Sequence, residues 1–165
     1  HDSLAKTFDI IESIFSTFFF FQTQIAQMLV NKAKVDQESI VVLSPYNAQV
    51  AEIKEELKKI KLEKVTVTTI SKSQGSEWRY VIVSTVISVP STELEIEHDG
   101  AWMSKHVGFV GDPHQINVAI TRAKEGLCII GNQGLLRLSK TWCQLLKHYT
   151  RHNAVTDAEK ISVLH

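Results

Sequence analysis

The chain is predicted to fold as a single α/β domain in which helices cover both faces of a mainly parallel sheet. Three observations predict this class. Short apolar runs rich in β-branched residues alternate with segments of helical periodicity. The apolar runs are continuous, as in parallel strands that are buried on both faces. Hydrophobic residues make up 44% of 165 residues, which is enough for one sizeable core. Strands joined by helices then form a three-layer sandwich.

The N-terminal part of the chain is expected to be helical. From Leu4 to Asn31 it contains neither Pro nor Gly, and apolar side chains recur at helical spacing. We therefore predict one or two helices and treat residues 1–34 as an N-terminal helical segment. The block Phe18–Phe21 within it is interpreted as a buried or interface-facing helix turn without a chemical role.

The first predicted strand is the apolar run Ile40–Leu43, which Ser44 and Pro45 end. Ser44 suits the N-cap of a helix and Pro45 suits its first position, so a helix is expected from Pro45 to about Ile60. The side chains expected to point inward from this helix are Val50, Ile53, Leu57 and Ile60.

Two further strands are predicted over Val65–Ile70 and Tyr80–Ile87, where β-branched residues dominate. The segment Ser71–Glu77 between them is polar and is expected to form a turn. Pro, Ser, Glu, His and Gly prevail over residues 88–111, which predicts a long surface excursion.

A helix start is indicated at Asp112, with Pro113 at the first helical position and Gln115 three residues after the cap. This helix is expected to continue until Gly126 closes it. The apolar run Leu127–Ile130 then predicts a fourth strand.

One more helix is expected over Lys140–Tyr149, followed by a polar, frayed C-terminal tail at residues 151–165. The main α/β domain is therefore expected to span residues 35–150. The chain begins at His1 rather than Met, which suggests a piece of a longer protein.

Composition excludes several classes of protein. Lys and Arg together number 18, as do Asp and Glu, so no uniform basic field exists and any polyanion site must be local. The apolar run Ile14–Phe21 is too short for a membrane span and lacks the flanks of a signal peptide. No membrane partner is therefore expected.

Cysteine and histidine give no sign of a metal site. Cys128 and Cys143 lack metal-ligand or redox spacing, and two cysteines are too few for a disulfide scaffold, so a reducing compartment fits best. His148 and His152 are four residues apart but have no third ligand, and we expect them to be solvated.

Candidate chemistry is expected at the carboxyl ends of the parallel strands. The loop after Ile70 stands out because it holds Gln74, Gly75 and Glu77. Arg122, near the end of a predicted helix, could present a planar fork of donors to a phosphate. Taken singly, these are an ordinary polar turn and a solvated helix charge.

The motifs gain meaning when they are read in order. Three motifs follow one another within Ser39–Tyr149: Ser44–Gln49, then Ser73–Glu77 leading into a strand, then Asn117–Ala123. This set resembles the C-terminal RecA-like domain of superfamily 1 helicases of the up-frameshift and senataxin kind. Within that group it is most similar to the helicase with zinc finger proteins.

The resemblance implies specific roles. Arg122, in the block matching "NVALTRA", would be the arginine finger that reaches the γ-phosphate of ATP on the partner RecA-like domain. Glu77, in the "QGxE" block, would lie at the ribose, with Gln74 and Gly75 shaping the turn beside the nucleotide. The residues implied to face single-stranded nucleic acid are Pro45, Tyr46, Gln49, Thr69, Ser71 and Ser73.

The sequence contains no phosphate loop of the form GxxxxGK[ST]. The resemblance therefore implies that the missing N-terminal RecA-like domain of the same chain holds most of the ATP and its Mg²⁺. This stretch alone is expected to be inactive in ATP hydrolysis. Its implied partners are single-stranded RNA or DNA, that first domain and protein cofactors, in the nucleus or the cytoplasm.

Two departures from the family pattern leave alternatives open. Ile87 stands where relatives carry an arginine, and Gln115 and Ile116 stand where relatives carry arginines before the asparagine. A degenerate helicase domain that serves as a protein-interaction or transcription-coactivator scaffold is the first alternative. An unrelated nucleotide-binding α/β protein is the second, and it would be favoured if Glu77 and Arg122 faced different sides of the sheet.

Overall fold

Strands and helices alternate along most of the chain in the computed structural model, which describes residues 6–9, 15–85, 111–131 and 133–157. The strands are β1 (Lys6–Asp9), β2 (Ile40–Ser44), β3 (Thr66–Thr69), β4 (Trp78–Ser84), β5 (Ala123–Gly131) and β6 (Val155–Asp157). The helices are α1 (Phe15–Asn31), α2 (Asn47–Lys59), α5 (Pro113–Ile120), α6 (Gln133–Leu136) and α7 (Lys140–Arg151), with 3₁₀ turns η1 (Gln37–Ser39) and η2 (Ser71–Ser73).

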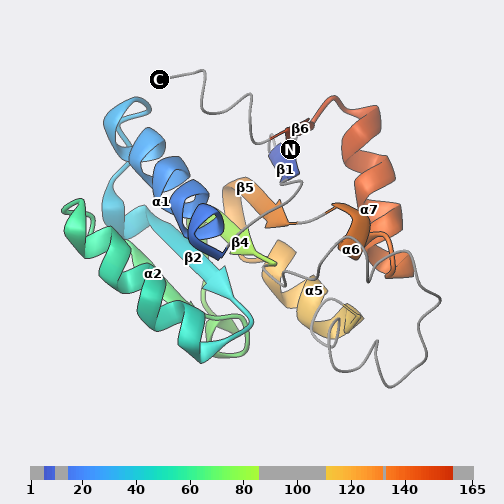
Figure 1. Ribbon diagram of the computed structural model, residues 1–165, viewed down its shortest axis with the longest axis horizontal. Helices are drawn as coiled ribbons and strands as arrows, with labels where there is room; N and C mark the ends of the chain where they lie inside the picture. The colour runs from blue at the N-terminus through green and yellow to red at the C-terminus, as the bar shows by residue number, and fades with distance from the viewer. Residues whose placement is uncertain (1–5, 10–14, 86–110, 132, 158–165) are drawn as a thin grey trace.

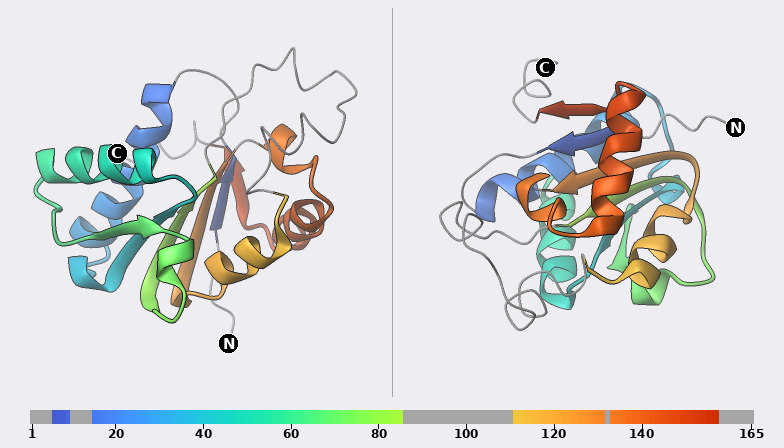
Figure 2. Two further views of the ribbon diagram at one scale, coloured as in Figure 1. Left: turned by 90° about the horizontal axis from the view of Figure 1, so that it is seen from below. Right: turned by 90° about the vertical axis from the view of Figure 1, so that its right-hand side faces the viewer.

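The six described strands form one sheet in the order β3-β2-β4-β5-β1-β6, and every pair of neighbours is parallel. Helices α1 and α2 cover one face, whereas α5 and α7 cover the other (Figures 1 and 2). The predicted three-layer α/β sandwich is thus confirmed.

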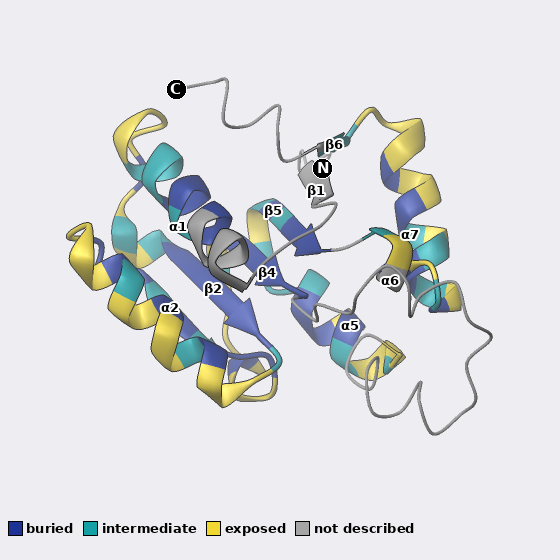
Figure 3. Cartoon of the chain, in the orientation of Figure 1, coloured by how far each residue is buried: buried dark blue, intermediate teal, exposed yellow. Residues whose placement is uncertain are grey.

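Strand β2 contributes side chains to two hydrophobic cores, one on each face of the sheet. All of its residues are buried, as predicted for Ile40–Leu43. Because successive side chains of a strand point to opposite faces, Val41 and Leu43 join the core under α5 and α7. Ile40 and Val42 join the core under α1 and α2. Figure 3 shows the buried strands between helices whose outer sides are exposed.

Helix α2 begins two residues later than predicted. Ser44 is still part of β2, where it pairs with Thr69, and its hydroxyl accepts from the Tyr46 amide at 3.2 Å. The helix therefore starts at Asn47 rather than at Pro45. Ile60 lies beyond the helix end and is 36% exposed, so the expectation that it points inward is wrong.

The prediction that Leu4–Asn31 is helical is wrong at its start. Lys6–Asp9 form strand β1, which pairs with β5 on one side and β6 on the other. Thr7 and Phe8 are good strand formers, but only these distant partners decide their conformation. The helix holds from Phe15 onward, and residues 10–14 lie outside the described part of the chain.

The expected polar tail also contributes to the sheet. Helix α7 continues to Arg151, and Val155–Asp157 then form β6 along β1. A three-residue strand in a polar sequence carries almost no local signal, and its pairing partner stands at the other end of the chain. Residues 158–165 lie outside the described residues.

Helix α5 starts as predicted, with the Asp112 carboxylate accepting from the His114 amide at 2.9 Å. Its end differs, because the helix stops at Ile120 and β5 begins at Ala123. Gly126 therefore lies in a strand, where an added Cβ would come within 2.7 Å of the Tyr80 ring. Close packing against that ring accounts for this glycine, rather than the end of a helix.

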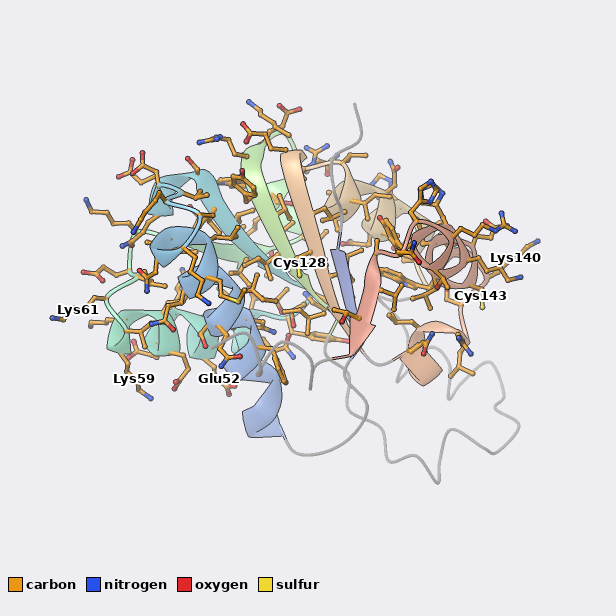
Figure 4. The ribbon with its side chains drawn as sticks, turned by 90° about the horizontal axis from the view of Figure 1, so that it is seen from above. Glu52, Lys59, Lys61, Cys128, Lys140 and Cys143 are labelled. Carbon is orange, nitrogen blue, oxygen red and sulfur yellow. The ribbon has the colours of Figure 1, made fainter. Side chains whose placement is uncertain are left out.

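The third predicted strand begins earlier than expected, at Trp78, and ends at Ser84, since Thr85 is described but no longer belongs to it. The expected strand end at Ile87 and the surface excursion at residues 88–110 lie outside the described residues. Cys128 packs on the α1 side of the sheet and Cys143 lies on α7, and neither forms a disulfide bond (Figure 4). No helix among the described residues is long and apolar enough to cross a membrane.

Candidate functional site

Glu77 and Arg122 meet at the amino ends of two neighbouring strands. Glu77 directly precedes Trp78, the first residue of β4, and Arg122 directly precedes Ala123, the first residue of β5. Trp78 pairs with Ala123, and the Trp78 amide donates to the Arg122 carbonyl at 3.0 Å. These candidates therefore lie at the opposite edge of the sheet from the carboxyl ends where chemistry was expected.

The guanidinium of Arg122 is half-buried and is held by three hydrogen bonds. Nε donates to the Val118 carbonyl at 3.0 Å, Nη1 to the Ser76 carbonyl at 3.2 Å and Nη2 to Thr121 Oγ1 at 3.0 Å. The contact with Ser76 fixes the guanidinium one residue away from Glu77. Both candidates thus lie at the same edge of the sheet.

Gln74 and Gly75 occupy the corners of a tight turn. The Ser76 amide donates to the Ser73 carbonyl at 3.0 Å, and Gln74 has φ −58° and ψ 127°. Gly75 has φ +87°. These values match a type II turn, whose third position favours glycine because its φ is positive. Both residues are exposed, and nothing lies within 4 Å of a Cβ added to Gly75.

Lys124 is a charged neighbour that sequence reasoning missed. Its Nζ lies 3.5 Å from Glu77 Oε2, and both side chains are more than half exposed. Such a pair is strongly screened by water and stabilises the fold little. Its position two residues after Arg122, at the start of a strand, is the signal that could have found it, since alternate strand residues share a face.

Helix α5 runs alongside the motif segment 71–76 and bonds to both of its ends. At the start of the helix, Gln115 Nε2 donates to Ser71 Oγ at 3.3 Å. At the end of the helix, Arg122 donates to the Ser76 carbonyl. The side-chain amide nitrogen of Gln115 thus ties the start of α5 to the start of the motif segment.

The candidates after β2 differ in their exposure. Gln49 is 9% exposed, and its Oε1 accepts from Ser44 Oγ at 2.6 Å. Tyr46 is 41% exposed, and the burial of part of its ring raises the pKa of the phenol above 10.0. Pro45 is partly exposed. Tyr46 therefore faces solvent, whereas Gln49 ties the start of α2 to the end of β2.

The candidates around η2 separate in the same way. Thr69 is 7% exposed, and its hydroxyl accepts from the Lys72 amide at 3.3 Å. Ser73 is fully buried, and its hydroxyl donates to the Ile70 carbonyl at 2.6 Å. Ser71 is exposed. The structure thus leaves only Ser71 of these three candidates with an outward hydroxyl.

The departures from the family pattern have a structural setting where they are described. Ile116 is 1% exposed and belongs to the core under α5, so an arginine could not take its place without loss of packing. Ile87 lies outside the described residues.

Among the described residues no cluster of three or more His, Cys, Asp or Glu side chains could hold a metal. His152 Nδ1 lies 2.8 Å from the His148 carbonyl.

Comparison with known proteins places this geometry in a family. Residues 20–134 match the profile of the AAA domain family. The chain is 49% identical over 140 residues to the mouse (Mus musculus) 3′-5′ exoribonuclease HELZ2, and 43% identical over 140 residues to its human (Homo sapiens) counterpart. In both comparisons 85% of this chain is covered, but only 5% of the relative.

More distant relatives agree. The Arabidopsis thaliana regulator of nonsense transcripts 1 homolog is 33% identical over 132 residues, which are 76% of this chain and 10% of that protein. The C-terminal domain of a possible DNA helicase from Lactobacillus plantarum WCFS1 has the same fold, with a TM-score of 0.52 at 12% identity. The match covers 84% of this chain and 83% of that one. The chain therefore belongs to the AAA domain family and is a C-terminal RecA-like domain of the superfamily 1 helicase type.

Proposed function

We propose that this domain is the second RecA-like domain of an ATP-dependent RNA or DNA helicase, with Arg122 as its arginine finger. The observation that carries the proposal is the guanidinium of Arg122, held beside Glu77 at the amino ends of β4 and β5. A guanidinium has five N–H groups, of which three are used within the described residues. One N–H on each terminal nitrogen remains to meet an oxyanion.

The chemistry of phosphoryl transfer suits this arrangement. Negative charge spreads over the γ-phosphate oxygens in the transition state, and a positioned arginine stabilises it. Arg122 would supply that charge, and the Glu77 carboxylate would accept from the ribose hydroxyls of the nucleotide. We assign the Mg²⁺ and most phosphate contacts to a first RecA-like domain, so that this domain alone would not hydrolyse ATP.

Single-stranded nucleic acid would contact the other edge of the sheet. Tyr46, Pro45 and Ser71 offer an exposed ring face and a hydroxyl there, which suit stacking and phosphate contact without sequence readout. Gln49, Thr69 and Ser73 are buried and would hold the loops that carry these groups. RNA is favoured as the strand because the HELZ2 relatives are 3′-5′ exoribonucleases.

The test is ATP hydrolysis by the full-length protein, with and without single-stranded RNA. Arg122→Ala is expected to lower turnover by about 10³-fold or more, as for other arginine fingers. Arg151→Ala, an exposed arginine at the end of α7, is the matched control and should leave turnover unchanged.

Equal turnover of the wild type and Arg122→Ala would refute the finger. A folded full-length protein without any ATP turnover would instead favour the alternative function, a degenerate domain that acts as a protein-interaction or coactivator scaffold.

A further inference from the structure

Thr121 stands between helix α5 and the Arg122 guanidinium. It is the C-cap residue of α5, and its side chain is exposed. Its hydroxyl donates to the Asn117 carbonyl at 2.7 Å and accepts from Arg122 Nη2 at 3.0 Å. The donation to a helix carbonyl turns an oxygen lone pair toward the arginine, so the hydroxyl works as an acceptor for the guanidinium.

Thr121 and Val118 together hold one edge of the guanidinium. Nε donates to the Val118 carbonyl at 3.0 Å while Nη2 donates to Thr121 Oγ1, and these two acceptors lie 3.2 Å apart. Two adjacent acceptors match the planar fork of an arginine. The Val118 carbonyl belongs to the main chain, so it does not depend on which side chain stands at position 121. The second acceptor, in contrast, requires a hydroxyl at that position.

Arginine has a long, rotamer-rich side chain, and a finger is effective only when its charge is already in position. The backbone of Arg122 is fixed by the Trp78 amide. Rotation about the side-chain bonds, in contrast, is restrained within the described residues by the hydrogen bonds to Val118, Ser76 and Thr121. Of these three, the Thr121 contact is the one made by a side chain.

We propose that Thr121 is a positioning residue whose hydroxyl orients the Arg122 guanidinium toward the nucleotide on the partner domain. This inference rests on the proposed function of Arg122 and adds a residue that acts through it. Loss of the hydroxyl leaves substrate binding intact but lets the guanidinium leave its working orientation. The loss should therefore appear in kcat rather than in the KM for ATP.

The experiment compares Thr121→Val and Thr121→Ser in the full-length protein with the wild type. Valine keeps the shape of threonine without its hydroxyl, and serine keeps the hydroxyl. Thr121→Val is expected to lower kcat roughly tenfold, the effect of one hydrogen bond to a charged group, with an unchanged KM. Thr121→Ser should restore kcat to near the wild-type value.

A double variant separates positioning from structure. In the Arg122→Ala background, Thr121→Val should cause no further loss of kcat, because the residue through which it acts is gone. Thermal unfolding reports whether each variant is folded, and Thr121→Ala replaces the valine variant if that one unfolds.

Two results would overturn the inference in distinguishable ways. If Arg122→Ala abolishes turnover but Thr121→Val leaves kcat unchanged, or serine fails to rescue, the positioning role is wrong and the finger stands. If Arg122→Ala itself keeps full turnover, the proposed function fails and the role of Thr121 with it.

Discussion

Two clusters of polar residues, one at each edge of the sheet, differ in their exposure to solvent. We call Ser76, Glu77, Thr121, Arg122 and Lys124 the amino-end cluster, and most of these side chains are exposed or half-exposed. We call Ser44, Gln49, Thr69, Ser84 and Thr85 the carboxyl-end cluster, whose members are all at most 9% exposed.

The contacts of the two clusters differ accordingly. In the carboxyl-end cluster, donors and acceptors satisfy each other inside the fold, as when the Thr85 hydroxyl donates to the Ile130 carbonyl at 2.8 Å. Buried polar groups need such partners, because an unpaired one is costly. Groups in the amino-end cluster can exchange a partner for water or ligand. This difference favours the amino-end cluster as the surface for a nucleotide.

The largest effect on stability is expected in the carboxyl-end cluster. Ser44→Ala removes the donor to Gln49 Oε1, which is buried, and the acceptor of the Tyr46 amide, which is partly buried. The free energy of unfolding should fall by about 1–3 kcal/mol. Urea denaturation measures it, with the exposed Ser71→Ala as control, for which the change should be small. Equal losses in the two variants would erase the distinction between buried and exposed hydroxyls.

A smaller effect is expected at Gly75. Alanine meets no atom within 4 Å there, so the positive φ of +87° is the only source of strain. Gly75→Ala should lower the free energy of unfolding by about 1 kcal/mol. Gly75→Asn should cost less, because asparagine tolerates a positive φ better than alanine. Chemical denaturation of both variants checks the order, and an alanine variant as stable as the wild type would contradict the turn geometry.

The smallest effect concerns an exposed ion pair near the amino ends of β4 and β5. Arg79 donates to both carboxylate oxygens of Glu125, at 2.7 and 2.9 Å, and these hydrogen bonds lower the pKa of Glu125 below 4.5. Because the pKa of Glu125 is lower in the folded state than in the unfolded state, the pair stabilises the fold at pH values above the unfolded-state pKa. This stabilisation is lost as the pH falls through the folded-state pKa. In Arg79→Ala, the pKa of Glu125 should rise toward 4.5.

An NMR titration of the Glu125 carboxyl carbon tests this shift, with Lys59→Ala, which removes an exposed ion pair on α2, as control. An unchanged Glu125 titration in Arg79→Ala would show that the pair does not persist in solution. Stability at neutral pH should hardly change, because exposed pairs contribute little.

Local sequence signals predicted the elements whose conformation is determined by residues close by in the sequence. The β-branched run at Ile40–Leu43 and the cap at Asp112 are present as expected. Strands β1 and β6 were missed because their conformation depends on partners far away in the sequence. The same holds for Ala123–Gly126, where Ala123 continues the helical spacing of the preceding segment but pairs with β4 instead.

The sequence named the candidate residues, but it did not reveal where in the fold they lie. The motif order indicated that Glu77 and Arg122 belong together, and the structure brings them to one edge. Glu77 follows the carboxyl end of β3 but lies at the amino end of β4, because residues 70–77 run back to the other edge of the sheet before β4 begins. Sequence could not reveal that Ser73 is buried, since a serine in a polar turn has no local mark of burial.

The position of β1 between β5 and β6 has a consequence for how the chain is made. Synthesis delivers Lys6–Asp9 first, but both strands that flank it come from the last third of the described chain. At ribosomal speed the segment waits on the order of ten seconds for its neighbours. The half of the sheet made of β2, β3 and β4 can assemble during this delay, and β1 gains its second neighbour only when Val155–Asp157 has left the ribosome.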